Sequence, residues 1–576
     1  MISDFLVIPG VILVLGGLLL FVIPERYRSA AFLVFPFLAL FAIWLPPEGS
    51  TTVLPFANYE LQPVHLDKLG RLFATIFGLI ALTGGIYAYH IKDLSQQSAA
   101  LFYAGGALGV ALAGDYFTLF VFWELMAVSS TWLIWARRTP TSDAAGMRYL
   151  CVHVLGGGIL LAGIVGHVAE VGSISIGALS EDAVSMSSIL ILTGVALNTA
   201  IPPLHAWLAD AYPKATITGA VFMSALTTKS AVYVLARLFP GWDILIVLGV
   251  VMALYGVVYA VLVNDIREIL AYHIVSQVGY MVAGVGIGTE MAINGTAAHA
   301  FSHILYKSLL FMGAGAVLYA TGKSKLTELG GFGHKMKVVV FLYMIGAFSI
   351  SGFPFFNGFI SKSMVVSAAG HAHLDAVTLL LILASVGTFL HTGLKLPYFT
   401  WFGTAKTAIE PGPVPKNMLI AMGVGAFLCT LFGVYPSLLY GHLPYPVDYE
   451  PYTVYHFVEM TQILVFTFIG FWLLRQKLEG APKIALDVDW LYRKPGAALG
   501  GALVRGTETV FSLFQQATQI LTVRVCQAFQ NPIHWLHLRA SGLPPASTYT
   551  QPTGLIAQLI VLAILIVFGA VLFYLN

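Results

Sequence analysis

Long apolar segments follow one another along almost the whole chain and are separated by short polar connections. A helix that crosses a membrane needs about 20 mostly apolar residues. By this measure the sequence contains about sixteen spans, at residues 5–23, 29–45, 70–89, 98–114, 116–136, 149–169, 186–210, 216–237, 243–263, 267–287, 293–320, 338–369, 375–402, 417–434, 454–474 and 555–575. The pattern therefore predicts an all-α polytopic membrane protein.

The basic residues of the connections give these spans an orientation. Cytoplasmic loops carry an excess of Lys and Arg. The odd-numbered connections are basic, with Arg26, Arg28, Lys92, Arg137, Arg138, Arg148, Lys214, Lys323, Lys325, Lys335, Lys337, Lys406 and Lys416. The even-numbered connections 170–185 and 435–453 carry carboxylates but no Lys or Arg. This alternation predicts that both ends of the chain lie on the outer side.

The segment 475–554 is too polar to span a membrane and precedes the last predicted span. Apolar and small residues recur there at three- and four-residue spacing, at Val504, Thr507, Val510, Phe511, Phe514 and Ala517. This spacing is typical of an amphipathic helix that lies along the membrane surface. The alternative is a cytoplasmic tail.

The composition supports the membrane assignment and excludes other classes. Hydrophobic residues make up 58% of the 576 residues and charged residues only 10%, whereas soluble proteins carry about 25% charged residues. The mean hydropathy is +0.84. The formal net charge of +2 argues against nucleic acid as a partner, because no basic face could cover many phosphates.

Motifs for cofactors and metals are missing from the sequence. Cys151, Cys429 and Cys526 lie far apart and give neither a disulfide framework nor a metal signature. There is no CxxCH haem motif, no cysteine cluster and no phosphate-binding loop for ATP. We therefore expect no cofactor, no metal and no redox chemistry in this chain.

Charged and titratable residues inside the predicted spans are the candidate functional groups. Such residues are costly to bury and usually mark ion or substrate pathways. They are Glu124, Lys229, His299, His303, Lys307, Lys362, His391 and Lys395. Lys and His side chains can change protonation state near neutral pH when buried, so a row of them can pass protons through or along the bilayer.

Each candidate has a plainer explanation that stays open. Glu124 could pair with a lysine as a static packing element, and Lys229 could be structural. A zinc site at His299 and His303 would need further ligands, which the spacing does not supply. Lys395 and His391 lie near the end of their span, where long side chains can reach the membrane surface.

Two spans contain helix-breaking residues at mid-depth, at 199–208 and 351–359. Paired interruptions in corresponding spans indicate an internal repeat with an ion path at the breaks. Each broken span is the fourth of a set of five. The sequence thus predicts two repeats, 98–237 and 243–402, preceded by spans in 1–97. They are followed by two spans in 417–474, the polar segment 475–554 and the last span, 555–575.

Four motifs resemble the antiporter-like proton-conducting subunits of Mrp cation/proton antiporters, respiratory complex I and membrane-bound hydrogenases. They are Phe-Trp-Glu-Leu-Met, Pro-Pro-Leu-His-Ala-Trp-Leu-Ala-Asp-Ala, Leu-Thr-Thr-Lys-Ser-Ala-Val-Tyr and Asn-Asp-Ile-Arg-Glu-Ile-Leu-Ala-Tyr-His-Ile-Val-Ser-Gln-Val-Gly-Tyr. The similarity covers about 65–405 and is nearest to the D-type component of Mrp antiporters. It implies fourteen core helices with two inverted five-helix repeats, and a lateral helix near the C-terminal end.

The resemblance implies roles for the buried charges. Glu124 matches the family's buried glutamate of the fifth helix, and Lys229 matches the lysine that links two half-channels. His299, His303 and Lys307 match the central polar row of the eleventh helix. These residues, with Lys362 near the exit of the second half-channel, would form the proton relay.

One position departs from the family pattern. The family usually has a lysine seven residues before the histidine of the Pro-Leu-His motif, where it pairs with the glutamate. Here the histidine is His205 and the earlier position is Asn198, which can neither hold nor release a proton. The first half-channel is therefore in doubt, and Asn198, His205 and Asp210 join Lys395 and His391 as further candidates.

The sequence predicts a multi-pass subunit of the prokaryotic plasma membrane that works beside other membrane subunits. The leading function is proton translocation coupled to a monovalent cation, with sodium implied by the resemblance alone. The alternatives are a proton-pumping arm of a complex I-like or hydrogenase-type redox complex, and the membrane subunit of a bicarbonate-accumulating complex. A scaffold with an inactive channel is a further alternative.

Overall fold

The computed structural model describes residues 8–404, 409–481, 486–530, 561, 562 and 564. The chain divides into two compact units, Met1–Asp489 and Trp490–Asn576. The predicted last span, 555–575, lies almost wholly outside the described residues. The two units are therefore described separately.

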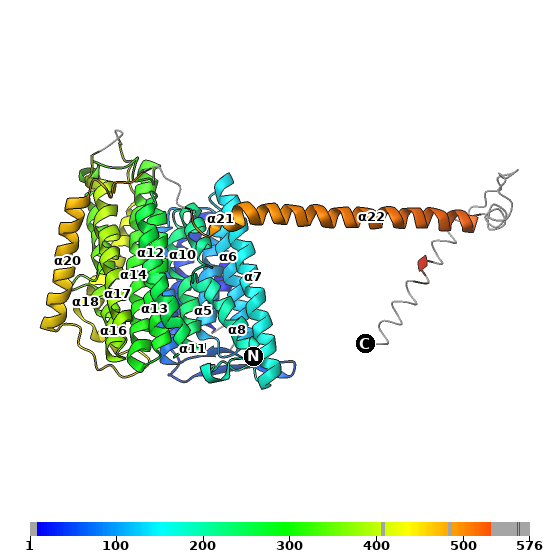
Figure 1. Ribbon diagram of the computed structural model, residues 1–576, viewed down its shortest axis with the longest axis horizontal. Helices are drawn as coiled ribbons and strands as arrows, with labels where there is room; N and C mark the ends of the chain where they lie inside the picture. The colour runs from blue at the N-terminus through cyan, green and yellow to red at the C-terminus, as the bar shows by residue number, and fades with distance from the viewer. Residues whose placement is uncertain (1–7, 405–408, 482–485, 531–560, 563, 565–576) are drawn as a thin grey trace. The chain divides into compact units, whose positions relative to one another are not determined.

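The first unit consists mainly of helices (Figure 1). Its longer helices are α2 (Pro9–Leu19), α3 (Glu25–Trp44), α4 (Lys68–Tyr87), α5 (Leu94–Leu112), α6 (Tyr116–Trp135), α7 (Pro140–Val171), α8 (Met186–Thr199), α11 (Thr227–Leu238), α12 (Asp243–Leu262), α13 (Ile266–Ile287), α14 (Glu290–Thr321), α15 (Lys337–Ser351), α16 (Asn357–His371), α17 (Asp375–Thr388), α18 (Lys416–Val434) and α20 (Val454–Leu474). Three are shorter: α9 (Ala206–Ala211), α10 (Gly219–Ala225) and α19 (Ser437–Tyr440).

Among the described residues, 11 helical segments are long and apolar enough to cross a membrane, and α2, α8 and α15 are shorter apolar helices. The predicted class of polytopic helical membrane protein is confirmed. The count of about sixteen spans stays a prediction.

A small antiparallel hairpin interrupts the helical pattern between α3 and α4. Its strands are β1 (Thr51–Phe56) and β2 (Tyr59–His65). The sequence interpretation missed this hairpin because it lies in a connection and its apolar run is short. The backbone of Gln62 in β2 donates to the Asp115 carboxylate at 2.7 Å, which ties the hairpin to the start of α6.

The two predicted repeats share several structural features. Asp115 caps the start of α6 and Asp265 caps the start of α13, each the second helix of its set. Each aspartate also forms an isolated β-bridge with a residue just beyond the third helix, at Ser175 and Lys325. The third helices, α7 and α14, are both 32 residues long. These parallels fit a repeat, while its inverted arrangement stays a prediction.

Both predicted interruptions are present. The helix α8 ends at Thr199 and is followed by Ala200 in the left-handed conformation, with φ of 63°. The helix α15 ends before Gly352, which has φ of 77°. In both places the chain resumes as a helix a few residues later, at α9 and α16.

The fifth helices of the two sets are also irregular, which the sequence analysis did not predict. The backbone turns at Leu226 between α10 and α11, where φ and ψ are −94° and −68°. In the second set, α17 continues into two π-helical segments, η4 (Phe389–Lys395) and η5 (Tyr398–Phe402). Such wide turns often occur at functional sites.

In the second unit, the longest described element is α22 (Ala497–Gln530), a single continuous helix of 34 residues (Figure 1). It includes the predicted amphipathic run, so the helix is confirmed. Its position along the membrane surface stays a prediction. The helix is preceded by α21 (Asp489–Leu491) and the π-helical turn η6 (Tyr492–Gly496).

Glycines allow α12 and α13 to pack with their backbones in close contact. A Cβ atom added at Gly249 or Gly279 would collide with the backbone of the opposite helix. Small residues are the usual means of close helix packing in membranes. This contact joins the first two helices of the second set.

We predict that Gly279→Val destabilises the protein, because the side chain would overlap the α12 backbone at Ala253. Overpacking of this kind costs about 1–3 kcal/mol. Thermal unfolding of the purified protein in detergent measures the effect. Gly470→Val is the control, because Gly470 faces open space, and equal melting temperatures for both variants would contradict the packing argument.

Candidate functional site

Glu124 lies on α6 in a narrow space against α7. The carboxylate is half-buried, and its Oε1 has no hydrogen-bond partner among the described residues. A Cβ atom at Gly157 would overlap this carboxylate, so glycine provides the space that it occupies. Asn198 on α8 is buried, and its Oδ1 also has no partner within the described part of the chain.

Hydroxyl groups form a chain in the first set of helices. Ser130 of α6 contacts the Tyr149 hydroxyl at 2.9 Å, and the Thr227 hydroxyl lies 3.5 Å beyond it. Tyr103 of α5 then contacts Thr227 at 2.6 Å. His153 stacks on Tyr149, with ring centroids 3.9 Å apart. This chain joins α5, α6, α7 and the start of α11, and sequence reasoning missed it because its members are ordinary polar residues.

Lys229 lies in the middle of the apolar segment Gly219–Leu238, as the sequence predicted, and directly beyond an irregular turn at Leu226 that the sequence did not predict. Its side chain is completely buried. Its Nζ donates to the Ser224 carbonyl at 2.6 Å and to the Thr228 hydroxyl at 3.1 Å. The turn releases this carbonyl from its helical partner, which makes it available to the ammonium group.

Lys362 has the same kind of environment in the second set. Its Nζ donates to the Ile350 carbonyl at 3.0 Å, in the last turn of α15, and to the Ser385 hydroxyl of α17 at 2.9 Å. It also lies over the Tyr280 ring, 5.7 Å from the centroid. The last carbonyls of a helix lack helical partners, so the interruption between α15 and α16 supplies the acceptor.

His299, His303 and Lys307 form a buried row on α14, as their four-residue spacing predicted. The two imidazole centroids are 6.2 Å apart, and Nδ1 of His299 lies 3.3 Å from the Ser361 hydroxyl. Neither nitrogen of His303 nor the Lys307 ammonium has a partner among the described residues. Buried polar groups need hydrogen-bond partners, and internal water can supply them, so this row suits a hydrated path.

A second buried row continues toward η4. His273 of α13 and His391 of η4 lie with their ring centroids 5.5 Å apart, and Lys395 donates to the Val261 carbonyl at 2.8 Å. Lys307 is close enough to His273 for their charges to interact. His391 and Lys395 are buried, 1% and 2% exposed, so they do not extend to the membrane surface.

His273 is the central residue that the sequence analysis did not single out. It is completely buried, and neither ring nitrogen has a partner within the described residues. The signal was available, because a histidine inside an apolar span is itself a functional candidate. Its neighbours in space come from α14 and η4, and only the fold shows this.

Asp210 and His205 are both paired with charged groups. Asp210 on α9 accepts from Arg148 at 2.7 Å and forms a second ion pair with Lys214. Nε2 of His205 lies 3.1 Å from the Asp487 carboxylate, which sequence reasoning missed. Burial raises the pKa of Asp487, but the hydrogen bonds from His205 and two tyrosines outweigh it and lower the pKa to about 2.

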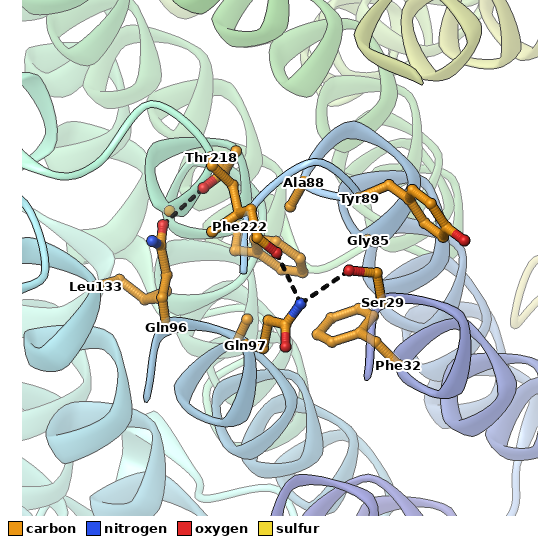
Figure 2. A pocket seen from close by; sticks show the side chains of 13 residues that line it. Ser29, Phe32, Gly85, Ala88, Tyr89, Gln96, Gln97, Leu133, Thr218 and Phe222 are labelled. Atoms are coloured by element: carbon orange, nitrogen blue, oxygen red, sulfur yellow. Dashed lines mark hydrogen bonds between the residues drawn. The ribbon is translucent and has the colours of Figure 1, made fainter. Parts of the chain in front are cut away.

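A pocket between α3, α4, α5 and α10 lies apart from these rows (Figure 2). Gln97 donates to the Ser29 hydroxyl at 3.2 Å, and Thr218 donates to Gln96 at 2.7 Å. Its lining includes no Lys, His or carboxylate. We therefore assign it to packing.

In the described part of the chain, no three His, Cys, Asp or Glu side chains are grouped as metal ligands.

Interrupted helices with buried lysines and a row of histidines define an ion-conducting membrane protein. A sequence model of the NADH:quinone oxidoreductase/Mrp antiporter transmembrane family matches residues 113–390. The chain belongs to this family, and it is a proton-translocating membrane component of antiporter type.

Related proteins support the family assignment. The chain is 30% identical over 392 residues to an uncharacterized protein of Methanocaldococcus jannaschii, covering 64% of this chain and 80% of that protein. It is 30% identical over 351 residues to the D component of the Na(+)/H(+) antiporter of Alkalihalophilus pseudofirmus, covering 56% and 70%. The match to the A component of the antiporter of the same organism, also 30% identical, covers 65% of this chain and only 53% of that longer protein.

Solved structures show the same fold. A chain of the Mrp complex from Dietzia sp. DQ12-45-1b matches with a TM-score of 0.69 and 24% identity, covering 81% of this chain and all of that chain. A chain of the membrane-bound sulfane sulfur reductase, an archaeal respiratory membrane complex, matches with a TM-score of 0.70 and 22% identity, covering 98% and 100%. The predicted membrane location and membrane-subunit partners are confirmed.

We predict that Gly157→Val impairs transport, because the new side chain would displace the Glu124 carboxylate. Gly158→Val is the matched control, since Gly158 is the next residue on α7 and faces open space. Proton uptake by vesicles that contain each variant measures the difference. Equal uptake by both variants would show that the position of Glu124 does not matter for transport.

Proposed function

We propose that this chain is the proton-translocating component of a multi-subunit Na⁺/H⁺ antiporter of Mrp type. In this proposal, protons move through the buried Glu, Lys and His groups described above. One observation carries it: Lys229 and Lys362 each donate to a carbonyl at a helix interruption, and the buried row on α14 has nitrogens without partners among the described residues. A static core would be expected to satisfy these groups.

The first stretch of the path runs through the first set of helices. Glu124 accepts a proton there, and the hydroxyl chain from Ser130 through Tyr149 to Thr227 can relay it by exchanging hydrogen bonds. Thr227 is two residues before Lys229, on the first turn of α11. The proton therefore reaches a lysine that already has a carbonyl acceptor for its charged form.

The central stretch depends on repulsion between like charges. Lys229 is close enough to Lys307 for their charges to interact. Two ammonium groups in a low-dielectric interior repel each other strongly, so protonation of one favours release of a proton from the other. The proton then passes along His303 and His299 toward Lys362, or through His273 toward His391.

The coupling ion and the assembly are inferred from relatives. The D and A components of the Na(+)/H(+) antiporter of Alkalihalophilus pseudofirmus are 30% identical to this chain over 351 and 426 residues. The spans of this chain offer no obvious carboxylate cage for sodium. Sodium would therefore bind in the neighbouring subunits of the assembly, and this chain would supply the proton path.

A second candidate function is the proton-pumping arm of a redox complex. It is favoured by the match to the membrane-bound sulfane sulfur reductase, which covers 98% of this chain, against 81% for the Mrp complex. The proteins that co-purify with the chain separate the two candidates. Fe–S or flavin proteins would support the redox arm, and small membrane subunits alone would support the antiporter.

We predict that Lys229→Ala and Lys362→Ala each lower proton transport by about 100-fold, a typical contribution of a proton-transferring group. Dye-reported proton uptake into vesicles containing the whole complex measures this. Lys337→Ala is the control, because Lys337 is an exposed lysine at the start of α15. Undiminished transport in both variants would identify the chain as a scaffold.

We also predict that Asn198→Lys changes the pH profile of ion-coupled transport. The substitution places a titratable cation at a buried position on α8, where the Asn198 side-chain oxygen has no partner among the residues that the structure describes. Transport in vesicles is measured from acid to alkaline pH for both proteins. An unchanged profile would mean that this position does not determine coupling.

A further inference from the structure

Asp487 lies in the segment that follows α20, and its carboxylate is almost completely surrounded by donors. Its Oδ2 accepts from the Tyr272 hydroxyl at 2.6 Å and lies 3.1 Å from Nε2 of His205. Its Oδ1 accepts from the Tyr255 hydroxyl at 2.5 Å and from the Val488 backbone at 2.6 Å. The residue is 9% exposed. Three side chains from other elements and one neighbouring backbone N–H therefore surround this buried carboxylate.

This carboxylate connects the two sets of helices. His205 lies in the first set, where the chain resumes as α9 after the interruption. Tyr255 and Tyr272 come from α12 and α13 of the second set. His205 and Asp487 are 282 residues apart in the sequence. Asp487 therefore contacts both sets of helices, close to the point where the interrupted helix of the first set resumes.

The contact determines which ring nitrogen of His205 is available. An ionised carboxylate only accepts hydrogen bonds, so Nε2 of His205 carries a hydrogen. The other nitrogen, Nδ1, is buried and has no partner among the described residues. The Tyr255 ring packs edge-on against the His205 imidazole, with ring centroids 4.5 Å apart. This contact restricts rotation of the imidazole ring. A carboxylate that orients a histidine in this way is a recurring means of fixing its tautomer.

We propose that Asp487 is a positioning residue that prepares His205 to take and release a proton at Nδ1. The proposal rests on the proposed proton-translocating function. A proton that arrives at Nδ1 forms an imidazolium ion, whose charge is balanced by the ionised Asp487. The same proton leaves from Nδ1, and the hydrogen bond that Nε2–H donates to Asp487 stays intact throughout.

Other titratable and charged groups also face this cluster. Tyr259 of α12 donates to the Leu486 carbonyl at 3.1 Å. Glu268 of α13 interacts electrostatically with Tyr272, and also with Lys214 and Asp210. These groups surround the His205–Asp487 pair. The hydrogen bond of the His205 ring goes to Asp487 and not to any of them.

The test compares pH profiles of proton transport in vesicles that contain the whole complex. Asp487→Asn keeps the shape of the side chain but removes the charge that balances the imidazolium. We expect the profile to move toward lower pH by about one unit, as loss of a neighbouring opposite charge would cause. In a His205→Gln background, Asp487→Asn should leave the profile unchanged. Asp448→Asn, an exposed carboxylate outside the cluster, is the control.

A purely structural latch would give a different result. Transport would then fall by the same factor at every pH, and the loss would persist in the His205→Gln background; either result overturns the proposal. If Asp487→Asn fails to assemble, Tyr272→Phe replaces it. This variant removes one competing donor and strengthens the counter-charge on His205, so the profile should move toward higher pH. An unshifted profile would overturn the proposal.

Lys229→Ala in the same vesicles separates this inference from the proposed function. If Lys229→Ala transports normally, the proton-translocating function itself fails. If Lys229→Ala is inactive and the Asp487→Asn profile does not move, only the role of Asp487 fails.

Discussion

A backbone carbonyl that has lost its helical partner is the group on which the rest of the candidate path depends. An ammonium group is strongly disfavoured in an apolar interior unless it has acceptors. Lys229 has the Ser224 carbonyl, released by the turn at Leu226, and Lys362 has the Ile350 carbonyl, released by the break after α15. Irregular backbone within a membrane is tolerated where it lines such a site. The helix interruptions and the buried lysines therefore explain each other.

In the proposed path, buried titratable groups of α13, α14 and η4 carry the charge in turn. His303, Lys307, His273 and His391 are buried, and they have ring nitrogens or an ammonium without partners in the described part of the chain. Asp210, in contrast, is held by Arg148 and Lys214 as a paired charge. In the described part of the chain, Asp210 thus belongs to an ion-pair cluster, whereas the buried histidines and Lys307 are the groups that the proposed relay uses.

The local sequence pattern was sufficient to predict many of the helices and both helix interruptions of this structure. Apolar runs predicted the helices, and the Gly and Pro residues near 199–208 and 351–359 predicted the two interruptions. The four-residue spacing of His299, His303 and Lys307 placed them on one face. The turn at Leu226 has no Gly or Pro signal, so the sequence places Lys229 in the middle of its span but does not reveal the irregular backbone beside it. The pairing of His205 with Asp487 joins residues 282 positions apart, and no local pattern could reveal it.

The most direct measurement is proton uptake by vesicles containing the whole complex with Lys229→Arg. Arginine keeps the positive charge and the hydrogen-bond donors that the Ser224 carbonyl accepts, but it does not release a proton at physiological pH. The account predicts a complex that assembles with its normal subunits and no longer transports protons. Normal transport by the assembled Lys229→Arg complex would show that Lys229 is a fixed charge and would contradict the relay.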